Sequence, residues 1–192
     1  MTGMQLIDIA LVIIWGVFFA YWWISAILNR TPFKRQSSRF SFFTCMGVPV
    51  AAILLAISLL TPDLFWIRIL PAALPLAIAG LLVTVAGLGI AVWARQHLGK
   101  NWSGRPAIRQ DHTIVRTGPY SMVRHPIYTG LLCGLAGTAI ATGLLITFSV
   151  TLVLLAVFIV KFRIEERFLL DEFGEDYARY MREVKALIPF VI

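Results

Sequence analysis

Residues 126–160 read PIYTGLLCGLAGTAIATGLLITFSVTLVLLAVFIV, an apolar stretch of 35 residues that contains no Asp, Glu, Lys or Arg. As one continuous helix the stretch would be about 52 Å long, whereas the hydrocarbon core of a membrane is about 30 Å thick. Thr142 and Gly143 lie near its middle, and glycine permits the tight turn that two antiparallel helices need. The stretch therefore predicts a helical hairpin, with helices over about 127–141 and 145–160.

The composition of the whole chain also indicates a protein inside a bilayer. Of its 192 residues, 59% are hydrophobic and 14% are charged, whereas soluble domains average about 45–50% apolar and about 25% charged residues. A soluble chain this short exposes too much surface to carry so many apolar side chains. Its two cysteines are too few for a disulfide scaffold. We therefore predict one all-α integral membrane domain over residues 1–192.

Three further runs are free of charged residues, and they cover residues 9–28, 40–60 and 69–94. Each is long enough to cross the hydrocarbon core as a helix. Together with the hairpin they predict five transmembrane helices. Residues 9–94 then hold spans one to three, and residues 95–192 hold the hairpin with a polar loop before it and a polar tail after it.

The basic residues indicate how the chain is oriented in the membrane. Sixteen of the 17 Lys and Arg lie in segments 29–39, 95–125 and 161–192, which five spans bring to one side, and only Arg68 lies on the other. Because cytoplasmic loops carry an excess of Lys and Arg, we predict a cytoplasmic C-terminus and an N-terminus outside, in the inner membrane if the host is bacterial. The net charge of +7 then reflects orientation, and we expect no nucleic-acid partner.

The tail shows the pattern of amphipathic helices. Its apolar residues recur at helical spacing, at Phe168, Leu169, Phe173, Tyr177, Tyr180, Met181 and Val184. Gly174 interrupts the pattern and predicts the end of one helix, while Glu175 and Asp176 favour the start of the next. We therefore predict C-terminal amphipathic helices lying against the bundle at the membrane surface.

The hairpin brings the polar loop and the polar tail together at one membrane boundary. Arg124 and His125 end the loop, and Glu165 and Glu166 follow the second hairpin helix. A carboxylate there is costly unless it is paired, and Lys161 precedes Glu165 by one helical turn. From these residues alone, Arg124 and His125 either anchor a helix end at the lipid headgroups or line a polar site. No cluster has the spacing of metal ligands, so we expect no metal.

Two strings in residues 95–192 resemble those of a known family. The first is Gly118-x-Tyr120-x3-Arg124-His125-Pro126-x-Tyr128-x-Gly130, and the second is Glu165-Glu166-x2-Leu169-x3-Phe173-Gly174-x2-Tyr177-x2-Tyr180. In this order they resemble the strings of the isoprenylcysteine carboxyl methyltransferases, whose prokaryotic members are small five-span membrane proteins. The resemblance covers residues 98–192, about half of the chain. Phospholipid N-methyltransferases and sterol reductases carry related versions of the first string.

The resemblance implies that residues 95–192 are a catalytic half, which binds S-adenosyl-L-methionine between the loop and the tail. Carried over by position, the implied cofactor-binding residues are His112, Ile114, Val115, Tyr120, His125, Pro126, Tyr128, Glu165 and Glu166. A substrate carboxylate needs a nearby cation, and Arg124, Lys161 and Arg163 are the candidates. The family's substrate arginine falls on Lys161, which cannot form a bidentate fork with a carboxylate, so Arg163 is a second candidate for that role.

Three functions remain open. The favoured one is carboxyl O-methylation of a lipophilic small molecule or a lipidated cysteine, of the isoprenylcysteine type, inside the lipid bilayer. The first alternative is N-methylation of a phospholipid amine, which needs a base such as His125 or a glutamate to remove a proton. The second alternative is a non-enzymatic membrane scaffold in which the first string only fixes a helix end.

Overall fold

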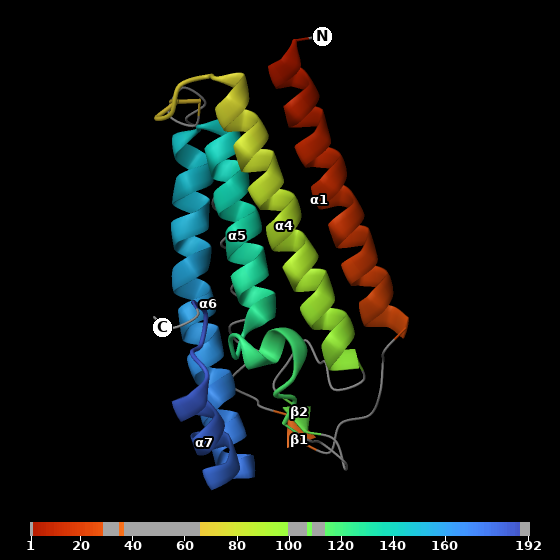
Figure 1. Ribbon diagram of the computed structural model, residues 1–192, viewed down its shortest axis with the longest axis vertical. Helices are drawn as coiled ribbons and strands as arrows, with labels where there is room; N and C mark the ends of the chain where they lie inside the picture. Colours follow the sequence, from red (N-terminus) through yellow and green to blue (C-terminus); the bar gives the residue numbers. More distant parts are fainter. Residues whose placement is uncertain (1, 29–34, 37–65, 100–106, 109–113, 189–192) are drawn as a thin grey trace.

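The computed structural model describes residues 2–28, 35–36, 66–99, 107–108 and 114–188 (Figure 1). The helices are α1 (Gly3–Leu28), α4 (Leu74–Leu98), α5 (Pro126–Thr142), α6 (Leu145–Phe173) and α7 (Glu175–Glu183). A short 3-10 turn, η2 (Gly118–Ser121), precedes α5. Two-residue strands β1 (Arg35–Gln36) and β2 (Ala107–Ile108) pair antiparallel. Apart from this two-residue pair, the regular structure of the described residues is helical, so the prediction of an all-α fold is confirmed.

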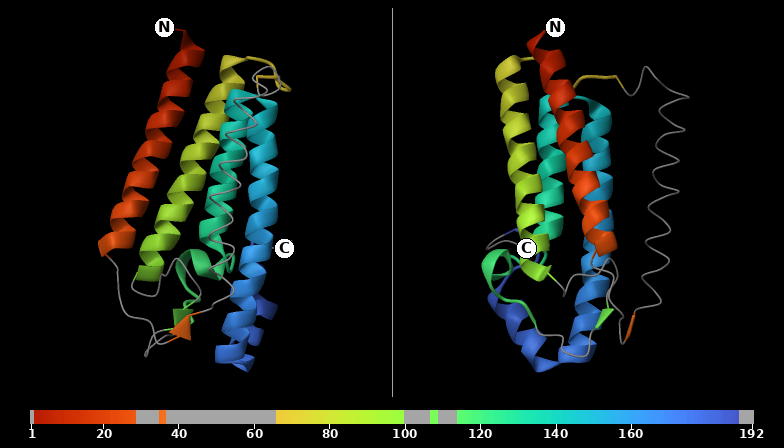
Figure 2. Two further views of the ribbon diagram at one scale, coloured as in Figure 1. Left: turned by 180° about the vertical axis from the view of Figure 1, so that it is seen from behind. Right: turned by 90° about the vertical axis from the view of Figure 1, so that its right-hand side faces the viewer.

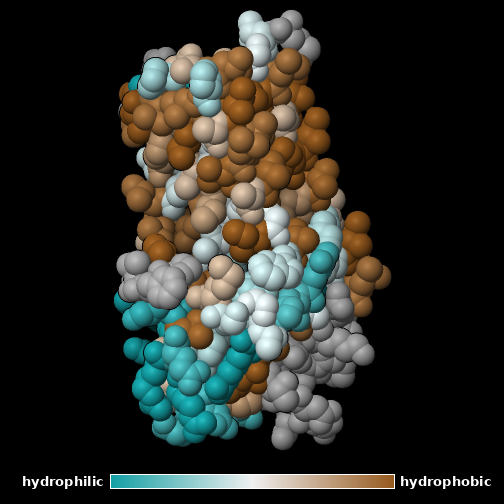
Figure 3. All heavy atoms as spheres, viewed as in Figure 1, coloured by the Kyte–Doolittle hydropathy of each residue, from teal (hydrophilic) through white to brown (hydrophobic). Residues whose placement is uncertain are grey.

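Helices α1, α4, α5 and α6 run side by side, and α7 lies at the end of the bundle opposite the N-terminus (Figures 1 and 2). Three of them, α1, α4 and α6, are long and apolar enough to cross a membrane, and α5 is a shorter apolar helix. On the face shown in Figure 3, apolar side chains cover the bundle, whereas hydrophilic ones gather around α7. The chain is therefore an integral membrane protein. The predicted span 40–60 lies outside the described residues.

The predicted third span starts and ends too early. Helix α4 covers Leu74–Leu98 instead of 69–94, and a proline occupies its first turn, where the missing N–H is not needed. Residues 67–69 pair with the hairpin turn, because the N–H of Ile69 donates to the Gly143 carbonyl at 2.8 Å and the N–H of Leu145 donates to that of Ile67 at 2.8 Å.

The hairpin itself is confirmed at the predicted turn. Helix α5 ends at Thr142, and Gly143 follows it in the left-handed conformation with φ 66°. The second hairpin helix is longer than predicted, because α6 continues through 161–173 without a break and reaches about 43 Å. It stops at Gly174, as predicted, where φ is 52°.

Glycines bring the backbones of α4 and α5 into direct contact. A Cβ atom added to Gly87 would lie 2.4 Å from the amide nitrogen of Gly134, and one added to Gly137 would lie 2.4 Å from that of Thr84. Gly130 lies in the same contact, since a Cβ atom added to it would lie 2.5 Å from the carbonyl oxygen of Gly87. Small residues are the usual means by which membrane helices approach each other.

Hydroxyl groups connect α1 to this pair. The Thr84 hydroxyl donates to the Gly80 carbonyl at 2.9 Å and lies 3.3 Å from the Thr138 hydroxyl. The indole N–H of Trp15 donates to the Thr138 hydroxyl at 3.0 Å. Because the backbones of α4 and α5 are in direct contact, the end of α4 and the start of α5 are fixed relative to each other.

Candidate active site

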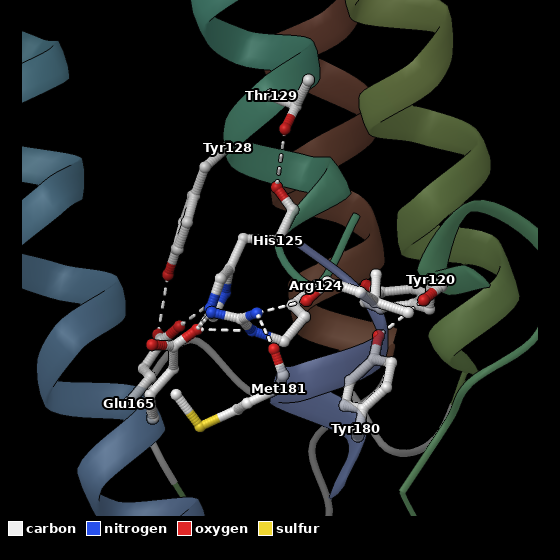
Figure 4. Close-up of polar contacts among 10 residues, drawn as sticks. Tyr120, Arg124, His125, Tyr128, Thr129, Glu165, Tyr180 and Met181 are labelled. Atoms are coloured by element: carbon white, nitrogen blue, oxygen red, sulfur yellow. Dashed lines mark hydrogen bonds and ion pairs between the residues drawn. The ribbon is translucent and has the colours of Figure 1, made fainter. Parts of the chain in front are cut away.

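Loop, α6 and C-terminal tail meet where α5 begins (Figure 4). His125 is the residue before the helix, with φ −122°, and Pro126 is the first helical residue. With ψ 58°, the backbone of His125 lies outside the α region, which proline disfavours for the residue before it, and proline itself is favoured as the first helical residue. The His125 and Arg124 side chains are turned toward the two glutamates of α6.

Glu166 is the centre of a buried ion-pair cluster. Its Oε1 accepts hydrogen bonds from Arg124, with Nε at 2.8 Å and Nη2 at 2.7 Å. Nε2 of His125 lies 3.0 Å from the same oxygen. The side chains of Arg124, His125 and Glu166 are only 8–9% exposed. A buried charge is retained in a fold when it is paired in this way.

Glu165, the next residue, has a more open environment. The hydroxyl of Tyr128 donates to its Oε1 at 2.7 Å, and Nδ1 of His125 lies 3.7 Å from its Oε2. The side chain of Glu165 is 19% exposed, against 8% for Glu166. The two adjacent carboxylates therefore differ, since Glu166 is paired with the Arg124 guanidinium, whereas Glu165 contacts the Tyr128 phenol and lies near the other ring nitrogen of His125.

Aromatic rings form the wall of the site toward the membrane. The ring of His125 stacks on those of Tyr128 and Phe162, with centroids 5.6 Å and 5.2 Å apart. The Tyr128 ring stacks in turn on Phe158 at 5.0 Å. Lys161 Nζ lies 5.1 Å from the Tyr128 ring centroid, and its charge interacts with Glu165.

The segment after α7, residues 184–188, forms a strap across the start of α5. Backbone N–H groups of Arg124 and His125 donate to carbonyls of the strap, to Lys185 at 2.8 Å and to Ala186 at 2.9 Å. The Thr129 hydroxyl donates to a third strap carbonyl, that of Leu187, at 2.7 Å. Ala186 and Leu187 are buried against the same aromatic wall. The strap therefore holds the loop in place mainly through backbone groups.

A second set of contacts ties η2 to α7. The hydroxyl of Tyr180 donates to the Tyr120 carbonyl at 2.6 Å, and Arg116 lies 5.4 Å from the Tyr180 ring centroid. Burial raises the pKa of the Tyr180 phenol to about 12. The pKa values of Tyr120 and Tyr177 are also raised, mainly by burial. These phenols therefore stay protonated at neutral pH and remain hydrogen-bond donors.

We expect Tyr180→Phe to lower the free energy of unfolding by about 1–3 kcal/mol, because the buried Tyr120 carbonyl would lose its partner. Thermal unfolding of the detergent-purified protein measures this. Tyr177→Phe, on the same helix, is the matched control and should cost less, since the Tyr177 hydroxyl does not donate to η2. Equal losses in both variants would contradict the assigned bond.

The structure brings most of the predicted site residues to this junction. They are Arg124, His125, Pro126, Tyr128, Lys161, Glu165 and Glu166. Tyr120 lies apart from the glutamates, with its hydroxyl 3.4 Å from the Ala94 carbonyl of α4. Ile114 and Val115 are half-buried in the segment before η2, Arg163 is exposed on α6, and His112 lies outside the described residues.

The sequence patterns missed three participants. His97, at the end of α4, contacts the Thr117 hydroxyl at 2.8 Å through Nε2, and its ring occupies the space that a side chain at Gly118 would need. Arg116 donates to the Asp176 carbonyl at 2.5 Å. The strap acts through carbonyl groups, which every residue type carries. Among the contacts between η2 and α7, only Tyr180 had a signal in the sequence, through the spacing of the tail tyrosines.

Comparisons with known proteins identify the relatives of the chain. Residues 76–176 match the model of the family described as phospholipid methyltransferase. The protein-S-isoprenylcysteine O-methyltransferase of Saccharomyces cerevisiae is 31% identical over 141 residues, which cover 70% of this chain and 57% of the yeast protein. The cobalt-zinc-cadmium resistance protein CzcN of Cupriavidus metallidurans is 33% identical over 118 residues, which cover 58% of this chain and 51% of that protein.

A solved structure agrees with these relatives. It is the eukaryotic intramembrane Ras methyltransferase, an isoprenylcysteine carboxyl methyltransferase, and it superimposes with a TM-score of 0.56 at 26% identity. The match covers 79% of this chain and 53% of that chain. The resemblance to isoprenylcysteine carboxyl methyltransferases is thereby confirmed.

Fold and site together define a helical membrane protein with a buried polar cluster where the loop, α6 and the tail meet. The chain belongs to the phospholipid methyltransferase family, whose model matches more than half of it. Membership of a methyltransferase family implies a methyl donor. The chain spans about half the length of the curated relatives that it matches.

Proposed function

We propose that this protein transfers a methyl group from S-adenosylmethionine to a carboxylate on a lipophilic, isoprenylcysteine-like substrate in the membrane. The observation that carries the proposal is the pair of adjacent glutamates with different surroundings. Glu166 is enclosed by Arg124 and His125, whereas the more exposed Glu165 lies beside aromatic rings and Lys161. A carboxylate and aromatic faces are suited to a cationic ligand.

The groups present fit the proposed donor. S-adenosylmethionine has an ammonium group and ribose hydroxyls, which need acceptors, and Glu165 offers a partly exposed carboxylate. Its sulfonium cation is suited to this aromatic wall, where the Tyr128 ring already has a cation, Lys161 Nζ, 5.1 Å from its centroid. When bound, the donor supplies a methyl carbon that is already activated by its leaving group. We therefore assign donor binding to Glu165, Tyr128 and His125, with His112, Ile114, Val115, Tyr120 and Pro126 as further candidates by position.

We assign the substrate carboxylate to Lys161, with Arg163 as the second candidate. Arg124 is less suited, because its guanidinium already contacts Glu166 and the carbonyls of Met181 and Val184. A substrate carboxylate is deprotonated at neutral pH, so it needs no general base. What these residues must supply is alignment of the carboxylate oxygen with the methyl carbon.

The lipid part of the substrate would approach from the side. Helix α6 exposes Leu152, Val153, Val157 and Val160 along its apolar length, within about two and a half turns of Lys161. A substrate whose chain lies along these residues has its polar end at the level of the site. A site at this position can be reached by a substrate whose lipid chain stays within the bilayer.

The family description favours phospholipid amine N-methylation as the second candidate. An ammonium must lose a proton before it can attack, and His125, between two carboxylates, is placed to take it.

The purified protein with S-adenosylmethionine should methylate a farnesylated cysteine derivative but not its carboxamide, which lacks the nucleophile. Methylation of phosphatidylethanolamine in place of the farnesylated acid would overturn the first proposal in favour of the second.

We further propose that the site faces the cytoplasm, with the N-terminus outside. Among the described residues, cations gather at the η2 and α7 end of the bundle and only Arg68 lies at the other, which supports this orientation. A reporter enzyme that works only in the cytoplasm should be active when it is fused after Ile192. A reporter that is active only outside the cytoplasm would reverse the orientation.

A further inference from the structure

We infer that Glu166 and Arg124 position the imidazole of His125 and are not themselves ligands of the methyl donor or the substrate. Resting on the proposed function, this inference divides the cluster into a supporting pair and a binding group. His125 and Glu165 belong to the binding group. Glu166, which the family resemblance places with the cofactor-binding residues, belongs to the supporting pair.

The contacts of Glu166 fix which nitrogen of His125 carries hydrogen. Oε1 of Glu166 accepts from Arg124 at 2.7 Å and faces Nε2 of His125 at 3.0 Å. A carboxylate that is paired with a guanidinium is ionised and only accepts hydrogen bonds, so Nε2 of His125 must donate. Nδ1 is then the nitrogen turned toward Oε2 of Glu165, at 3.7 Å. The ring cannot rotate freely, because Tyr128 and Phe162 stack on it.

Arg124 fixes Glu166 in the same way that Glu166 fixes His125. Nη1 of Arg124 donates to the carbonyls of Met181 and Val184, the former at 3.1 Å. The guanidinium therefore joins the loop, α6 and the C-terminal strap (Figure 4). It cannot turn toward a ligand without depriving these part-buried carbonyls of a donor and leaving Glu166 with His125 alone, which is costly.

Two substitutions of Glu166 separate positioning from charge. Glu166→Gln removes the charge but keeps the length of the side chain, so its amide oxygen still accepts from Nε2 of His125. Glu166→Asp keeps the charge beside Arg124 but shortens the side chain, so it draws the acceptor away from His125. If the role is positioning, the glutamine variant should resemble the parent protein; if the role is charge alone, the aspartate variant should.

Side-chain nitrogen NMR of the full chain, labelled with ¹⁵N-histidine in detergent micelles, provides the measurement. His125→Gln identifies the His125 signals by their loss, and His97 serves as an internal reference because its Nε2 contacts Thr117. In the parent protein we expect hydrogen fixed on Nε2 of His125. Glu166→Asp should shift both ring nitrogens toward the average of two tautomers, whereas Glu166→Gln should leave them nearly unchanged.

Methyl transfer per folded molecule is the second readout, with a fall of about tenfold or more for Glu166→Asp and a smaller one for Glu166→Gln. Arg124→Lys, which keeps the charge and loses the fork, is a further variant and should shift the His125 signals as well. The inference is overturned if Glu166→Asp leaves those signals unchanged, or if Glu166→Gln shifts them equally. Because the NMR result does not require catalysis, it stays distinct from a failure of the proposed function.

Discussion

Replacing Glu165 with alanine is expected to weaken the binding of S-adenosylmethionine by about 10- to 150-fold and to lower methyl transfer at least as much. This range corresponds to the loss of a charge-assisted hydrogen bond, about 1.5–3 kcal/mol. Glu165 is the more exposed of the paired carboxylates and lies next to the aromatic wall. Isothermal titration calorimetry on the detergent-purified protein measures the affinity directly.

Two further variants serve as controls for the loss of S-adenosylmethionine binding in Glu165→Ala. Glu165→Gln keeps a hydrogen-bond acceptor for the Tyr128 hydroxyl, so it should fold normally and still bind the donor weakly. Asp171→Ala removes an exposed carboxylate from the same helix, and it should leave the titration unchanged. If Glu165→Ala binds S-adenosylmethionine as the parent protein does, the assignment of the donor site is wrong.

The second large effect is expected where α4 and α5 touch. Gly87→Ala should destabilise the bundle by about 1–3 kcal/mol or more, because the added Cβ would lie 2.4 Å from the backbone nitrogen of Gly134. Backbone atoms cannot move aside as a flexible side chain does, so the two helices must separate. Thermal unfolding in detergent, followed by circular dichroism, measures the loss.

Gly89→Ala is the matched control for this prediction. Gly89 lies two residues along the same helix, and an added Cβ meets no atom within 4 Å there. Alanine also has the higher helix propensity, by about 1 kcal/mol, so this variant should be as stable as the parent protein or more stable. Equal destabilisation by both substitutions would mean that the helices are not packed through Gly87.

The hairpin and its turn were predictable because both signals are local. A charge-free run too long for one span must turn, and Gly143 offers the left-handed conformation that the turn uses. Gly174 ends α6 for a similar reason. The end of α6 was placed too early because a change from apolar to charged residues marks a membrane boundary. Residues 161–173 contain neither glycine nor proline, so the helix continues past that boundary.

The candidate site was predictable only in part. The hairpin topology already places Arg124 and His125 beside Glu165 and Glu166. It does not distinguish the two glutamates, because the difference between them depends on which way each faces around α6. The strap was also beyond prediction, since its contacts use backbone carbonyls that no residue pattern marks.

The chemical form of the transferred methyl group tests the central claim most directly. The purified protein in lipid vesicles would be supplied with S-adenosylmethionine carrying a tritiated methyl group and with a farnesylated cysteine derivative. A methyl ester is hydrolysed by mild alkali and releases labelled methanol, whereas a methyl group on nitrogen is stable to this treatment. We predict that the lipid-phase label is released as volatile methanol, and that Glu165→Ala lowers the amount. Label that stays with the lipid after alkali would contradict carboxyl methylation.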